Sequence, residues 1–235
     1  MQHLHMTAEL NQKEIVEIGR RYHFQTSDLT MLENLYAVMC PLLDVQAWYL
    51  VDPQLPNIEF SHYVAAYMTL GEGVDALQDV YLNRNHVSEA YMIECIALEL
   101  LSRSYEAFAK EVQLQTGMYA VRIHFLGDRY PFSLIDEING QMPDTGVSFN
   151  AEYSMTPQKS VALLLELQDS RQPESHIVDA AQVKHRADAM CHVRLAHICA
   201  DCPNTDCEYR QRENYTYGYQ RIFGRGRMPD RKKGE

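Results

Sequence analysis

The feature that most constrains the fold is a continuous apolar run, Val161-Ala-Leu-Leu-Leu165. Five apolar residues in a row are typical of a strand that is buried on both faces. Such a strand must lie inside a sheet that other elements cover on each side. The run therefore predicts a layered domain with this segment at its centre, and a hydrophobic content of 46% is sufficient for such a core.

Helical spacing dominates the sequence before this run. Two helices are expected in the first forty residues, with Ser27 as a candidate N-cap of the second. The longest helix is expected from about His86 to Val112, with Gly117 as its stop. The apolar face of the second helix comprises Leu29, Leu32, Tyr36 and Met39. The core stripe of the long helix comprises Tyr91, Leu98, Leu101, Tyr105, Phe108 and Val112.

Three further segments have the composition or the alternation of strands: Ile58 to Leu70, Met118 to Phe125, and Val147 to Tyr153. A turn at Gly71–Gly73 and a short helix over Val74, Leu77 and Tyr81 follow the first, and a helix through Leu134 and Ile138 follows the second. The order of elements predicts an α+β single domain, with a mixed or antiparallel sheet, flanking helices and a helical, cysteine-rich C-terminal extension.

Charge and hydropathy exclude several classes of partner. The net charge of -11 argues against nonspecific binding to nucleic acid or to an anionic membrane. No segment approaches the roughly 20 apolar residues that a membrane helix requires. Residues 1–21 have no apolar signal core. We therefore expect a cytoplasmic protein with neither nucleic acid nor membrane among its partners.

Two segments carry candidate binding residues. In the first, the strand ending at Phe125 presents Arg122 and His124 on one face and Tyr119, Val121, Ile123 and Phe125 on the other, and it leads into Gly127-Asp128. An arginine there is suited to hold a carboxylate by two parallel hydrogen bonds. The second segment, Ser154-Met-Thr-Pro157-Gln-Lys-Ser160, enters the buried strand. By spacing alone, both also fit ordinary connections between elements.

Together, these segments resemble the activation domain of vitamin B12-dependent methionine synthase, in a stand-alone form. The resemblance rests on Gly127-Asp128 after Arg122, on Met155, Pro157 and Ser160-Val161, and on Cys199-x-x-Cys202-x-x-x-x-Cys207 followed by Arg210. The stretch Tyr67 to Asp75 adds to it, so that it spans roughly residues 60 to 210. Phe125 and Leu126 depart from the proline, glycine or tyrosine of the family.

The resemblance implies an accessory component of a methyltransferase system that binds S-adenosylmethionine. It implies that Arg122 holds the methionine carboxylate and Glu99 lies near the amino group, with Gly127, Asp128, Met155, Pro157 and Ser160 completing the site. It also implies a partner, a cobalamin-binding methyltransferase or corrinoid protein, and an electron donor. The chain has no Asp-x-His-x-x-Gly motif, so the cobalamin belongs to the partner.

Four of the six cysteines, Cys191, Cys199, Cys202 and Cys207, lie within seventeen residues. In a reducing compartment this spacing indicates a metal site, with an iron–sulfur cluster favoured over zinc or no metal. The expected organisation is an activation-like domain over 1–190, the cysteine cluster over 191–210 and a basic tail over 211–235. The alternatives are an iron–sulfur electron-transfer or metal-binding module that no longer binds S-adenosylmethionine, and a zinc-stabilised interaction module.

Overall fold

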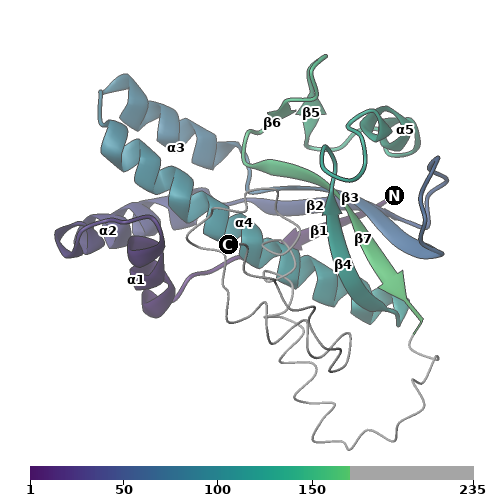
Figure 1. The fold of residues 1–235 in the computed structure, drawn as a ribbon. Coiled ribbons are helices and arrows are strands. Elements are labelled where there is room, and N and C mark those ends of the chain that lie inside the picture. Colours follow the sequence, from purple (N-terminus) through teal and green to yellow (C-terminus); the bar gives the residue numbers. More distant parts are fainter. Residues whose placement is uncertain (170–235) are drawn as a thin grey trace, which may run out of the picture. The chain divides into compact units, whose positions relative to one another are not determined.

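The computed structural model describes residues 1–169, which lie within one compact unit (Figure 1). Its centre is a five-stranded sheet in the order β1-β2-β3-β7-β4, and every neighbouring pair is antiparallel. The expected α+β class is confirmed, and the sheet is antiparallel rather than mixed within the described residues. The strands are β1 (Gln2–Met6), β2 (Val45–Val51), β3 (His62–Thr69), β4 (Tyr119–Phe125) and β7 (Ser160–Gln168).

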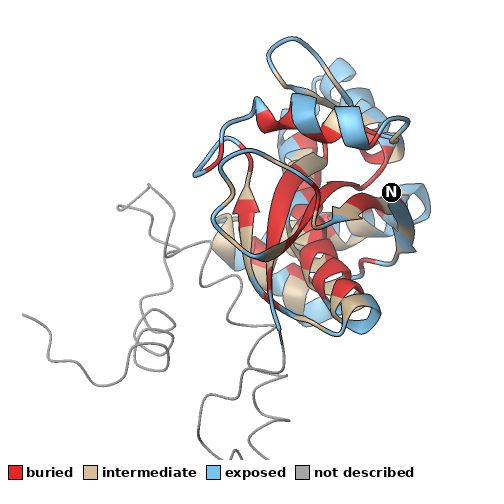
Figure 2. Ribbon diagram, turned by 90° about the vertical axis from the view of Figure 1, so that its right-hand side faces the viewer, coloured by how far each residue is buried: buried red, intermediate tan, exposed pale blue. Residues whose placement is uncertain are grey.

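Strand β7 contains the apolar run and lies between β3 and β4. Leu163 and Leu165 face one core cluster, whereas Ala162 and Leu164 face a second cluster on the opposite side of the sheet. Each of these four side chains is buried. Figure 2 shows that buried residues, in red, concentrate in the strands and in the helices beside them. The prediction of a strand that is covered on both faces is therefore confirmed.

Four helices contribute to the core cluster on the first face of the sheet; the longest contacts the strands, and the other three pack against it (Figure 1). The longest, α4 (Val87–Thr116), ends at Gly117, whose left-handed conformation closes the helix as expected. The others are α1 (Gln12–Arg21), α2 (Leu29–Met39) and α3 (Glu72–Asn83). A capping box formed by Asn11 and Glu14 begins α1. The 3-10 turns Thr26–Asp28 and Cys40–Leu42 flank α2, and Ser27 lies inside the first turn instead of capping α2.

The second face is covered by α5 (Leu134–Gln141) and by loops. A two-stranded hairpin of β5 (Ser148–Phe149) and β6 (Met155–Thr156) lies on the same side. The strand expected over Val147–Tyr153 is therefore too long, because a turn that Asn150 stabilises through its side chain ends β5 after two residues.

The stripe expected along α4 is correct in its second half only. Leu101, Tyr105, Phe108 and Val112 are buried, but Tyr91 and Leu98 are 51% and 43% exposed. In the first half the buried face is Ile93, Ile96, Ala97 and Leu100. The first half of the helix therefore buries a different face from the one that the sequence stripe marks.

A β-bulge in β4 modifies the expected alternation. Ala120 pairs with Leu167 and Arg122 pairs with Glu166, so that Val121 is the extra residue between them. Consequently Ala120, and not Tyr119 or Val121, is buried in the core cluster under α4. Beyond the bulge the pattern is as expected, since Ile123 and Phe125 pack against that cluster.

Candidate functional site

Arg122 lies on the second face of the sheet, directly opposite Glu166 of β7. Directly opposed residues of an antiparallel pair present their side chains on the same face, about 5 Å apart at Cβ. The Glu166 side chain is 29% exposed. An arginine and a glutamate are thus paired on one face of the sheet, at a partly open position.

A buried aromatic group adjoins this pair. His124 donates from Nε2 to Glu166 Oε2 over 3.1 Å, and its side chain is 5% exposed. Phe60 stacks on the imidazole at 4.8 Å between ring centroids, and Tyr130 meets it edge-on at 5.7 Å. Burial lowers the pKa of His124 and outweighs the opposing effect of Glu166, with Arg122 lowering it further. The imidazole is therefore neutral at pH 7.

The loop after β4 is closed on itself. Gly127 has φ +96°, and its N–H donates to the Tyr130 carbonyl over 2.7 Å. A Cβ at Gly127 would lie 2.2 Å from the Phe132 ring. Glycine is therefore required here because the Phe132 ring of the same chain lies against this position. Asp128 is exposed at the tip of the loop.

Met155, Pro157 and Ser160 lie in a second region, where β7 begins. Pro157 is buried after a cis peptide bond, and Met155 packs at the edge of the second core cluster. Ser160 Oγ is 2.9 Å from Thr69 Oγ1. Six residues of strand separate Ser160 from Glu166, which is roughly 20 Å. The two sequence-predicted segments are therefore held by the same strand, but Arg122 and Ser160 lie near its opposite ends.

A buried ion network holds this second region. The Lys159 ammonium lies 2.7 Å from Glu94 on α4 and 4.0 Å from Asp75 on α3, and its side chain is 8% exposed. Asp75 also accepts from the Gln158 backbone N–H over 2.5 Å. The segment from Tyr67 to Asp75 and the segment that enters β7 are thus joined by polar contacts. These contacts give Lys159, Glu94 and Asp75 a structural role, because they hold the two segments together.

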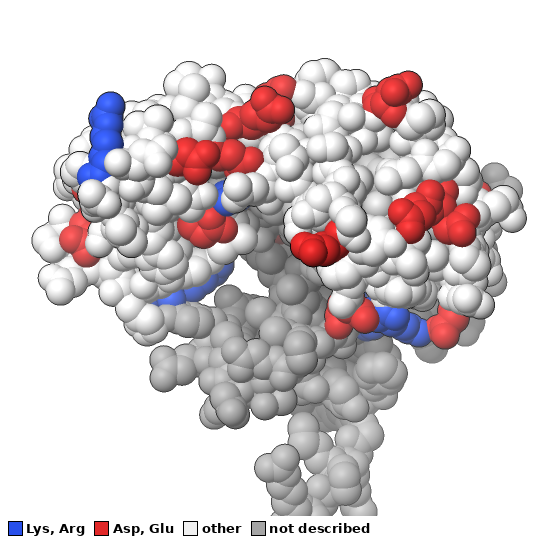
Figure 3. All heavy atoms as spheres, turned by 90° about the horizontal axis from the view of Figure 1, so that it is seen from above, with Lys and Arg blue, Asp and Glu red and all other residues white. Residues whose placement is uncertain are grey.

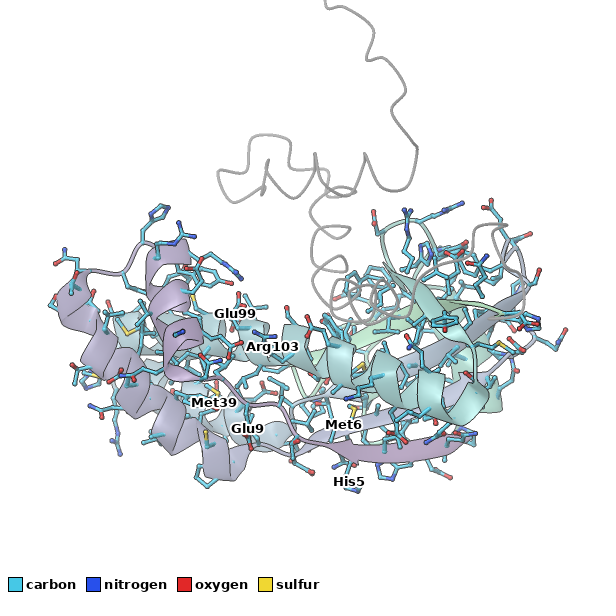
Figure 4. All side chains as sticks on the ribbon, turned by 90° about the horizontal axis from the view of Figure 1, so that it is seen from below. His5, Met6, Glu9, Met39, Glu99 and Arg103 are labelled. Atoms are coloured by element: carbon cyan, nitrogen blue, oxygen red, sulfur yellow. The ribbon has the colours of Figure 1, made fainter. Side chains whose placement is uncertain are left out.

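Glu99 lies on the other side of the sheet from Arg122. It comes from α4 and forms an ion pair with Arg21 of α1. Figure 4 shows it on the long helix together with Arg103, which pairs with Glu14 and Glu106. The Arg21–Glu99 and Arg103–Glu14 pairs tie α1 to α4. The structure does not bring Glu99 and Arg122 together, so one ligand cannot contact both in this arrangement.

Glu166 and His124 were absent from the set of residues expected to bind a ligand. The sequence contains a signal for each, since Glu166 is the single charged residue between Leu163 and Leu167, and His124 is two residues from Arg122. A polar side chain within an otherwise buried strand requires a partner. Only the pairing of β4 with β7 reveals that His124 and Glu166 are partners of each other.

Two open hollows occur elsewhere on the described surface. One, of about 520 Å³, is lined by β1 and α4 residues that include His5, Met6 and Glu111. The other, of about 360 Å³, lies beside α5 and includes Asn139 and Phe149. Neither includes Arg122, and chemistry favours the Arg122–Glu166 position because charged and titratable groups converge there. Figure 3 shows that the face seen from above carries more carboxylates than basic groups.

Some predictions fall outside the described residues. Cys191, Cys199, Cys202 and Cys207 lie there, as do the expected helical C-terminal extension and the basic tail. Within residues 1–169, no three His, Cys, Asp or Glu side chains are grouped so as to hold a metal ion. In the same residues, no helix combines the length and the apolar character that crossing a membrane requires.

The sequence matches no protein-family model and no curated protein. Among solved structures, the chain is similar to a crystal structure of the MetH reactivation domain bound to AdoHcy. The identity is 11%, the alignment covers 80% of this chain and 85% of the other, and the TM-score is 0.49. At these values the similarity does not extend to individual site residues.

Proposed function

We propose that this chain binds S-adenosylmethionine and acts as an accessory protein in the reductive methylation of a cobalamin held by a partner protein. The observation that carries the proposal is the Arg122–Glu166 pair on one face of the sheet. An amino acid presents a carboxylate and an ammonium group together, and a neighbouring guanidinium and carboxylate match them in charge. The sequence motifs around Arg122 and Ser160 support the same ligand.

In this proposal Arg122 holds the methionine carboxylate and Glu166 receives the ammonium group. Glu166 takes the place that the sequence resemblance gave to Glu99, because Glu99 is engaged with Arg21 on the opposite side of the sheet. Gly127 and Asp128 lie in the loop after β4, where the Leu126 N–H donates to the Ala162 carbonyl, so this loop adjoins the start of β7. Met155, Pro157 and Ser160 support β7 from its other end and contribute indirectly.

The protein's contribution is placement. The partner's cobalamin would supply a Co(II) centre that, after taking one electron from a donor protein, would accept the methyl group of the sulfonium, and S-adenosylhomocysteine would leave. The chain's residues must hold the amino-acid end of the ligand so that the methyl group remains accessible to a large macrocycle. An open position on the sheet suits that requirement better than an enclosed cavity.

Calorimetric titration with S-adenosylmethionine tests the binding. We expect Arg122→Ala to lose about 2–4 kcal/mol of binding free energy, the cost of removing a charged hydrogen bond. The matched control is Arg20→Ala, because Arg20 is exposed on α1 and pairs with Glu17, far from β4 in the sequence. Equal affinities of Arg122→Ala and the parent would disprove the assignment.

A second assay addresses the partner. The protein is mixed with an oxidised corrinoid protein, a reductant and S-adenosylmethionine, and methylcobalamin is followed by its absorbance. We expect methylation to require both this chain and the ligand. An absence of methylation with every corrinoid protein of the same cell would leave the partner proposal without support.

The alternative is an iron–sulfur or other metal-binding electron-transfer module that no longer binds S-adenosylmethionine. Phe125 and Leu126 favour it, because both serve the core: the Phe125 ring packs against Tyr105 at 5.4 Å, and Leu126 is 6% exposed. An ultraviolet–visible spectrum of anaerobically purified protein tests it. Charge-transfer bands that disappear in a variant with Cys199 and Cys202 replaced by serine, together with no ligand binding, would favour this module.

A further inference from the structure

His124 occupies a place that ligand binding by Arg122 and Glu166 does not by itself explain. The imidazole is fixed by Phe60 on its face and by Tyr130 at its edge. Its Nε2 proton points to Glu166, since a carboxylate only accepts hydrogen bonds. A buried ring that is fixed in this way holds one oxygen of the Glu166 carboxylate, Oε2, by a hydrogen bond.

We infer that His124 is a positioning residue that orients Glu166 toward the ammonium group of the ligand and makes binding sensitive to protonation. This inference rests on the proposed binding of S-adenosylmethionine. It goes beyond that proposal because it assigns a role to a residue that does not touch the ligand.

The charged groups around His124 decide what its protonation does. Glu166 faces it from β7, Arg122 from β4, and Arg129 and Tyr130 from the loop after β4. From the loop before β3, Phe60 faces it, and the neighbouring Glu59 pairs with Arg129. Burial and the two guanidinium groups keep the pKa of His124 below its usual value, although Glu166 opposes them.

Protonation adds a positive charge where the ligand already carries one. S-adenosylmethionine has a sulfonium, an ammonium and a carboxylate, so its net charge is positive. An imidazolium beside Glu166 would partly neutralise that carboxylate and repel the cationic ligand. S-adenosylhomocysteine lacks the sulfonium charge and should be affected less. The affinity for S-adenosylmethionine is therefore full near neutral pH and falls as the pH drops through the lowered pKa of His124.

The test is calorimetric titration of the full chain with both ligands between pH 5 and pH 8. For the parent we expect affinity for S-adenosylmethionine to fall progressively toward the acid end, and the limit for one pKa unit of coupling is about tenfold. S-adenosylhomocysteine should lose about threefold or less, in keeping with its missing charge.

Two variants separate positioning from a merely structural role. His124→Gln retains a donor for Glu166 but does not titrate, so most of the affinity at pH 7.5 should remain and the acid-side loss should disappear. His124→Leu removes the donor, so affinity should be lower across the whole pH range. Thermal unfolding of each variant, measured first, establishes that it folds.

A measurement without ligand keeps the inference separable from the proposed function. The imidazole resonances of His124 are titrated by NMR in the parent and in Glu166→Gln, where loss of the carboxylate should lower the pKa of His124. An unchanged titration, or a His124→Gln pH profile equal to that of the parent, overturns the inference while the proposed function stands. Absence of S-adenosylmethionine binding by the parent at every pH overturns the proposed function, and the inference with it.

Discussion

The buried contact between Lys159 and Glu94 provides a demanding test of the structure. The perturbation is Glu94→Leu, which leaves an ammonium group with 8% side-chain exposure and Asp75, at 4.0 Å, as its remaining carboxylate partner within residues 1–169. At 2.7 Å and an effective dielectric constant of 20, the gross attraction between Lys159 and Glu94 is about 6 kcal/mol, much of which desolvation cancels. Breaking a buried pair costs about 3–5 kcal/mol.

The expected loss lies at the lower end of that range, because the Glu94 side chain is 34% exposed. We expect a decrease of about 3 kcal/mol in the free energy of unfolding. Urea unfolding with linear extrapolation measures this decrease, and the slope of the free energy against urea concentration should not change. The matched control is Glu17→Leu, which breaks an exposed pair with Arg20 and should change stability little. A loss below about 1 kcal/mol for Glu94→Leu would refute the reasoning.

The same pair predicts a pH dependence. Burial raises the pKa of Glu94, but hydrogen bonds from Lys159 and Gln78 and the charge of Lys159 together hold it below its usual value. A carboxylate with a lowered pKa in the folded state stabilises the protein above its unfolded-state pKa, and this contribution is lost as the pH falls through the folded value. Stability should therefore fall below about pH 4.5 in the parent, and less steeply in Lys159→Met/Glu94→Leu.

Four further outcomes are expected. Gly127→Ala should lower the free energy of unfolding by about 1–3 kcal/mol, because φ is +96° and Phe132 occupies the space of a Cβ. An unchanged free energy of unfolding would contradict the loop geometry. Phe108→Ala, at a fully buried position, should cost about 3–5 kcal/mol in urea unfolding. Glu99→Gln should bind S-adenosylmethionine as the parent does, and a large loss by calorimetry would restore Glu99 to the site. Because the pKa of His124 is lowered by folding, stability should begin to fall as the pH drops below about 6.5, and His124→Gln should lack this component.

Local sequence patterns predicted the structure correctly where a short stretch of residues determines burial or backbone conformation by itself. The run Val161–Leu165 determined a central strand, because a segment without polar residues has no solvent face. Gly117 determined the end of α4, because the left-handed conformation costs glycine little. The α+β class followed from the order of such elements. Arg122 was likewise expected on the face opposite Ile123 and Phe125, and it lies there.

The tertiary structure decided what depends on residues distant in sequence. Whether Glu99 faces a ligand or Arg21 depends on how α1 packs against α4. That Glu166 stands opposite Arg122 depends on the register of β7 against β4 and on the bulge at Val121. A shift of one residue in that register would turn Glu166 to the other face of the sheet. Sequence identifies which residues can bind charge, whereas strand register and helix packing determine which of them meet.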